Sequence, residues 1–121
     1  MDIKFKALGH TIQFDCSARD TRDGFAHDAT IIIDGRRARK HTSYYLNRTW
    51  EAFRYQSACL GCVYDLIDER VYDLKEDYRH ANGISRICGS KRKQEVEDII
   101  SSDENIKLYR EIKRILDTKS F

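Results

Sequence analysis

Cys59 and Cys62, separated by two residues, are the pair in this sequence whose spacing offers the most chemistry. A C-x-x-C pair can exchange a disulfide, or it can supply two of the four ligands of a structural zinc ion. Redox pairs of the thioredoxin type lie at a helix N-terminus, where the helix dipole lowers the thiol pKa. Cys59 and Cys62 fall well inside a predicted helix, on its apolar side, and this position disfavours redox chemistry.

A zinc site would need two further ligands, and His80 with Cys88 would complete the pattern C-x2-C-x17-H-x7-C. The second pair in a structural zinc site is normally spaced as closely as the first, which is not so here. We therefore interpret Cys59 and Cys62 as small buried thiols beside Gly61, a residue that indicates the close approach of another element. No cofactor is expected on this interpretation, and metal analysis of the purified protein would decide the zinc alternative.

The strongest cluster of positive charge is the segment RRARKH at 36–41. On a strand its side chains alternate between two faces, with Arg37, Arg39 and His41 on one and Arg36, Ala38 and Lys40 on the other. Such a stripe of cations can follow a phosphate backbone, and Tyr44 or Tyr45 can stack on bases. Two alternatives stay open: a charged edge strand that resists aggregation, or a surface that binds a protein.

A second basic segment, SKRKQE at 90–95, contains Lys91, Arg92 and Lys93 at the start of a predicted helix. Cations are unfavourable at that position because the N-terminal end of the helix dipole is itself positive. We interpret these three residues as contacts for an external acidic partner.

Composition and missing motifs argue against several functional classes. The 22 basic and 20 acidic residues give a net charge of +2, which argues against an acidic protein that imitates DNA. The sequence lacks the P-loop, dinucleotide-binding, G-x-S-x-G and H-E-x-x-H motifs, so it nominates no catalytic residues. No purely apolar run exceeds the three residues of 31–33, so we expect no signal peptide, no membrane span and a cytoplasmic location.

Hydrophobic periodicity predicts an antiparallel sheet of about four strands in the first part of the chain. Apolar and polar residues alternate in two early segments, 3–6 and 12–16. Asp34-Gly35, between a β-branched run and a second extended run, predicts a tight hairpin that joins strands near 29–33 and 36–45. The polar segment 17–29 is predicted to be a loop or a distorted strand end.

A helical period begins after Asn47, which is a candidate N-cap together with Thr49. Its apolar stripe recurs at steps of three and four residues and is widened by three neighbours: Trp50, Phe53, Ser57, Leu60, Gly61, Tyr64 and Ile67, with Ala58, Cys62 and Leu66 beside them. Asn82-Gly83 predicts the C-terminal end of this helix through a left-handed cap.

Two more helices are predicted at 91–100 and 103–117, the second of them preceded by Ser101 and Glu104 at capping-box spacing. Strands that precede helices indicate an α+β fold. We expect one domain, 1–121, with a β-rich part at 1–46 and three or four helices at 47–121 packed on one face of the sheet.

The segment YYLNRTWEAFRYQSACLG, residues 44–61, resembles a pattern found in small proteins of Gram-positive phages and plasmids. The resemblance implies an accessory protein of a mobile element, similar to the anti-CRISPR proteins that act against host defences. It therefore implies a non-enzymatic inhibitor that binds a host nuclease, either a Cas effector or its complex with guide RNA. A small nucleic-acid-binding protein that uses the 36–41 segment is the alternative.

Overall fold

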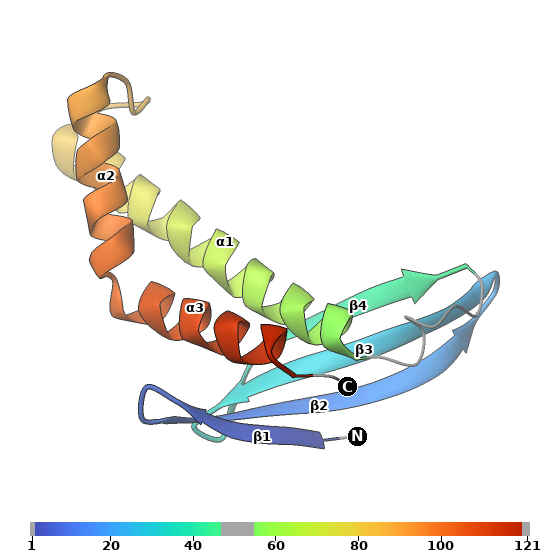
Figure 1. The fold of residues 1–121 in the computed structure, drawn as a ribbon. Coiled ribbons are helices and arrows are strands. Elements are labelled where there is room, and N and C mark those ends of the chain that lie inside the picture. Colours follow the sequence, from blue (N-terminus) through green and yellow to red (C-terminus); the bar gives the residue numbers. More distant parts are fainter. Residues whose placement is uncertain (1, 47–54, 120–121) are drawn as a thin grey trace.

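The computed structural model describes residues 2–46 and 55–119, and it has a four-stranded antiparallel sheet followed by three helices (Figure 1). The strands pair in chain order: β1 (Asp2–Ala7), β2 (His10–Thr21), β3 (Gly24–Ile33) and β4 (Arg36–Tyr45). The helices are α1 (Gln56–Asn82), α2 (Ser90–Ser102) and α3 (Glu104–Asp117). The α+β prediction, with strands first and helices after, is confirmed.

The predicted hairpin at Asp34-Gly35 joins β3 to β4 through two residues in the left-handed region, with φ of 51° and 81°. Positive φ at both central positions is the signature of the type I′ turn, whose twist matches that of the strands. The Asp34 carboxylate lies 2.6 Å from His10 Nδ1 and accepts a 2.9 Å hydrogen bond from the Thr11 amide, and the two contacts lower its pKa. These bonds tie the turn to the start of β2.

The prediction of a loop at 17–29 is wrong, because β2 and β3 extend through this segment to a two-residue turn at Arg22-Asp23. Opposite pairs such as Ser17 with Asp28 continue the ladder without interruption. Three polar residues of this segment, Ser17, Arg19 and Asp28, lie on the face of the sheet that no helix covers, where polar side chains are stable.

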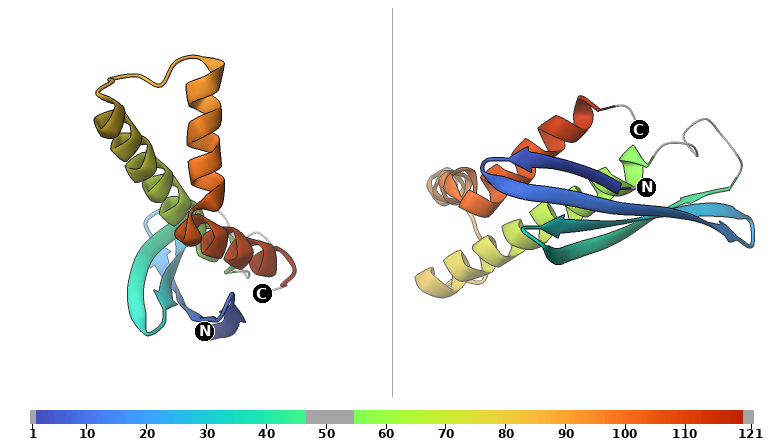
Figure 2. Two further views of the ribbon diagram at one scale, coloured as in Figure 1. Left: turned by 90° about the vertical axis from the view of Figure 1, so that its left-hand side faces the viewer. Right: turned by 90° about the horizontal axis from the view of Figure 1, so that it is seen from below.

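Helices α1 and α3 cover one face of the sheet, with α1 over β3 and β4 and α3 beside β1 (Figure 1). The other face carries no helix (Figure 2). Ile12, Phe14 and Ile31 on the covered face are fully buried, and they form one hydrophobic core with residues of α1 and α3. Burial of this one face fixes the register of the strands.

The buried stripe of α1 is centred on small residues: Ala58, Cys59, Cys62, Val63 and Leu66. Ala58, Cys62 and Leu66 of the predicted stripe are buried, whereas its residue Tyr64 is 46% exposed, so the buried face is displaced from the predicted centre. The helix ends at Asn82 as predicted, with Gly83 in the left-handed region at φ 62°. The predicted N-cap residues Asn47 and Thr49, with Trp50 and Phe53 of the predicted stripe, lie outside the described residues.

The second half of α1 extends beyond the sheet and packs with α2 and the start of α3 around a separate cluster of Tyr78, Val96, Ile100 and Ile106 (Figures 1 and 2). Asp103 caps α3 by accepting the amide hydrogen of Ile106, and Arg70 donates two hydrogen bonds to the same carboxylate, of 2.8 and 3.1 Å. The predicted cap at Ser101 was wrong, because that residue belongs to α2. Among the helices in the described ranges, none has the length and apolar character needed to cross a membrane.

Candidate binding surfaces of the sheet

Strand β4 carries most of the predicted contact residues, and a bulge changes the faces on which they lie. Ile31 pairs with Arg39 and Ile32 with Arg37, so Ala38 is the extra residue. An extra residue reverses the alternation of all side chains beyond it. Arg37 therefore shares a face with Lys40, and its predicted placement with Arg39 and His41 is wrong.

Arg39 and His41 lie on the covered face and contact carboxylates of α1. Arg39 Nη1 lies 3.3 Å from Glu69 Oε2, and Arg39 Nε lies 3.6 Å from Asp65 Oδ2. His41 Nδ1 lies 2.9 Å from the same Asp65 oxygen, and its ring faces Gly61. The close approach predicted from Gly61 is thus confirmed, and these two basic residues of β4 hold the helix on the sheet.

The two tyrosines at the end of β4 lie on opposite faces of the sheet. Tyr45 lies on the covered face, where its ring centre is 5.7 Å from that of Phe25 and 5.1 Å from that of His27. Tyr44 is 70% exposed on the opposite face, and the Arg19 guanidinium lies 6.0 Å from its ring centre. Of the pair, Tyr44 is the one with a face open to a stacking partner.

We define the open sheet face by the residues that the strand register places opposite the helices. Its cations are Lys4, Lys6, Arg19, Arg37 and Lys40, and its carboxylates are Asp2, Asp15 and Asp28. A hollow of about 220 Å³ on this face has Arg37 and Lys40 among its lining residues, with Asp15 and Asp28 beside them.

One carboxylate of the open sheet face is balanced internally. Thr42 donates a 2.5 Å hydrogen bond to Asp28, and Arg19 Nε donates one of 2.9 Å. The bond from Thr42 and that from Arg19 lower the pKa of Asp28. Within the described part of the chain, neither Arg37 nor Lys40 forms an ion pair within 4.0 Å, so both keep charge to offer a partner.

The remaining predicted contact residues do not join this surface. Arg36 is exposed at the start of β4, on the helix side of the sheet. Lys91, Arg92 and Lys93 form the first turn of α2, far from the sheet at the other end of α1 (Figure 1).

The comparisons with known proteins identify no family and no relative for this chain. No family model, curated protein or solved structure matches the chain.

The four candidate zinc ligands are not brought together. Cys59 and Cys62 are fully buried between α1 and the sheet, whereas Cys88 is exposed in the connector before α2, and His80 lies on the exposed last turn of α1. No three His, Cys, Asp or Glu side chains within residues 2–46 and 55–119 are grouped as metal ligands. The partner of Cys59 is instead Cys16 of β2, at 3.5 Å between the sulfurs, a contact that the sequence spacing could not indicate.

Both buried thiols of the C-x-x-C pair are held in the protonated form. The hydrogen bond with Cys16 and burial together raise the pKa of Cys59 far above its usual range. Burial raises the pKa of Cys62 to about 11, and its sulfur donates a 3.2 Å hydrogen bond to the Ala29 carbonyl. Because the thiolate is the reactive species, neither residue has the character of a nucleophile or a redox thiol.

We predict that iodoacetamide modifies the folded protein quickly at Cys88 alone and reaches Cys16, Cys59 and Cys62 only after denaturation. The reason is the exposure of Cys88 against the burial of the other three. Peptide mass mapping after timed labelling, with a denatured sample as control, measures this order. Rapid labelling of Cys59 or Cys62 in the folded protein would contradict the packing of α1.

Proposed function

We propose that this protein binds single-stranded nucleic acid through the open sheet face. The observation that carries the proposal is the bulge at Ala38, which brings Arg37 beside Lys40, on the same face of the sheet as the exposed ring of Tyr44. Cations that follow a phosphate backbone beside an aromatic ring are the usual elements of sequence-tolerant recognition of single strands.

The strand register supports a path for the nucleic acid across the sheet. Lys4, Gln13, Ile32 and Arg37 occupy one row that crosses all four strands. Three inter-strand spacings make this row about 14 Å long, enough for the backbone of a short single-stranded segment. Lys4 and Arg37 would contact phosphates at its ends, and Tyr44 on the edge strand would stack on a base.

The double variant Arg37→Glu/Lys40→Glu should weaken binding of a labelled RNA or DNA 12-mer about tenfold or more at low salt. The loss of two phosphate contacts should also make the dependence of log Kd on log salt shallower by about 1.4. Fluorescence anisotropy over a salt series measures both quantities.

The matched control is Lys107→Glu/Arg110→Glu, an identical charge change at exposed positions of α3. We expect it to change affinity by no more than about twofold, because these residues lie on the helical side of the sheet and act only through long-range charge. Equal losses of affinity in both double variants, or no complex at low salt with either oligonucleotide, would contradict the proposal.

A second candidate function is inhibition of a host defence nuclease of the Cas type, and the resemblance of residues 44–61 to proteins of phages and plasmids favours it. Cas effectors hold guide RNA and DNA in positively charged channels, and a protein of net charge +2 is poorly suited to enter such a channel as a DNA mimic. Contact of Arg37 and Lys40 with the guide RNA of the loaded complex would avoid this conflict.

Under the second candidate, the protein should co-purify with a guide-loaded Cas effector and slow its cleavage of target DNA. Binding to free oligonucleotides alone would leave only the first function, whereas binding that requires the effector would support the second. If the protein co-purifies with none of the candidate effectors, the inhibitor function is ruled out. The Arg37→Glu/Lys40→Glu variant tests both candidate functions, since it should also abolish inhibition if these residues contact the guide RNA.

A further inference from the structure

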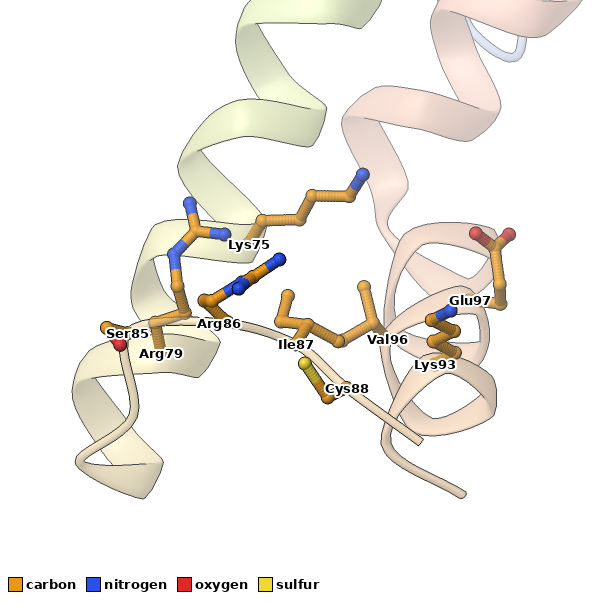
Figure 3. Close-up of a pocket in the computed structure, with 9 residues that line it drawn as sticks. All are labelled: Lys75, Arg79, Ser85, Arg86, Ile87, Cys88, Lys93, Val96 and Glu97. Atoms are coloured by element: carbon orange, nitrogen blue, oxygen red, sulfur yellow. The ribbon is translucent and has the colours of Figure 1, made fainter. Parts of the chain in front are cut away.

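The end of the helical part farthest from the sheet contains a cleft of about 610 Å³, which we call the distal cleft. It lies between the last turns of α1, the connector 84–89 and the start of α2 (Figure 3). Its size is that of a small-molecule site, for which volumes of roughly 300–1,000 Å³ are typical. Ile87 and Val96 supply apolar side chains between the two helices, and Ser85 and Cys88 contribute a hydroxyl and a thiol.

Four cations from three segments line the distal cleft: Lys75 and Arg79 from α1, Arg86 from the connector and Lys93 from α2. Glu97 is the one carboxylate that lines it. Glu76 binds Arg79, whereas Lys75, Arg86 and Lys93 form no ion pair within the described residues. Positive charge is therefore in excess in the cleft, where the carboxylates of Glu97 and Glu76 balance only part of the charge of the four cations.

This arrangement opposes the stability of the helices that carry it. Lys75 and Arg79 are four residues apart on α1, a spacing at which like charges repel. The first turn of α2 contains Lys91, Arg92 and Lys93 and no acidic residue, and its N-cap Gly89 offers no side chain. By contrast, Asp103 and Glu104 give α3 an acidic start. A bound anion would offset these unfavourable charges, because it is stabilised both by the cations and by the helix dipole.

We propose that the distal cleft binds the phosphate chain of a nucleotide, with Lys75, Arg79, Arg86 and Lys93 on the phosphates and the base against Ile87 and Val96. Convergent cations match the multiple charges of a di- or triphosphate, and the arginine forks pair with phosphate oxygens two at a time. The apolar side chains between the helices match the faces of a planar base. The phosphate chain can belong to a free nucleotide or to the 5′ end of an RNA.

Isothermal titration of the whole protein with ATP, without magnesium, tests the site. The variant Arg86→Gln/Lys93→Gln changes two exposed side chains outside the hydrophobic cluster and should weaken ATP binding about tenfold or more through lost charged hydrogen bonds. Its matched control, Lys107→Gln/Arg110→Gln at exposed positions of α3 outside both proposed sites, should leave ATP binding unchanged. Equal losses in both variants, or no heat at millimolar ATP, would overturn the proposal.

Two further titrants identify the source of the phosphate chain. Tripolyphosphate should bind more weakly than ATP, because it lacks a base to contact Ile87 and Val96; equal affinity would overturn the nucleotide assignment. A short RNA with a 5′-triphosphate that competes with ATP, where the same RNA with a 5′-hydroxyl does not, assigns the site to RNA ends. If neither RNA competes, the site belongs to free nucleotides. Failure of oligonucleotide binding at the sheet leaves these results unaffected, since they depend on a different surface.

Discussion

Replacement of Phe14 by alanine should lower the free energy of unfolding by about 3–5 kcal/mol, the cost of removing a large buried aromatic side chain and leaving a cavity. Phe14 is fully buried on β2, between Ile3 of β1 and Ile31 of β3. Its ring also stacks on that of Phe5, with 6.2 Å between the ring centres. Because α1 and α3 close the same core from above, the surrounding side chains have little freedom to fill the space.

Urea denaturation followed by circular dichroism measures this loss, and Tyr72→Ala is the matched control. Tyr72 is an aromatic residue of α1 with 62% exposure, so its truncation should change stability by no more than about 0.5 kcal/mol. A shift of one residue in the β2 register would move Phe14 to the open sheet face and remove the contrast. Similar midpoints for the two variants would therefore contradict the register as well as the core.

Those features of the fold that depend on short segments were predictable from sequence. Asp34-Gly35 specifies its turn through the φ values that these two residues tolerate, and Asn82-Gly83 ends α1 for the same local reason. The prediction of a loop at 17–29 is wrong because it rests on the polarity of that segment alone. On a sheet with one uncovered face, polar residues continue a strand as readily as apolar ones.

The candidate surfaces were less predictable, because they depend on contacts between distant segments. The bulge at Ala38 follows from how β4 pairs with β3, and the sequence of β4 alone does not indicate it. The sequence predicts Arg39 and Arg37 alike as residues that can bind a partner. Arg39, however, forms ion pairs with Asp65 and Glu69 of α1, which lie 26 and 30 residues later in the chain. The distal cleft likewise brings together cations between positions 75 and 93 that are not clustered in the sequence.

The close contact between β4 and α1 at Gly61 gives the second large predicted effect: Gly61→Ala should lower the stability of the protein. Alanine is favoured over glycine inside a helix by about 1 kcal/mol, so an unconstrained site would gain stability. At Gly61, however, a Cβ atom would overlap the ring of His41, which its contact with Asp65 holds in place. We expect a net destabilisation of about 1–3 kcal/mol, the usual cost of overpacking.

A double-mutant cycle with His41→Ala distinguishes this clash from any intrinsic effect on the helix. His41→Ala alone should destabilise the protein, because it removes the contact with Asp65 and leaves a gap beside Gly61. In that background Gly61→Ala should become neutral or stabilising, since the added methyl group enters the space that the imidazole has left. Chemical denaturation of the four proteins gives the coupling energy, and additive losses would show that α1 does not approach β4 as closely at Gly61 as the ring contact implies.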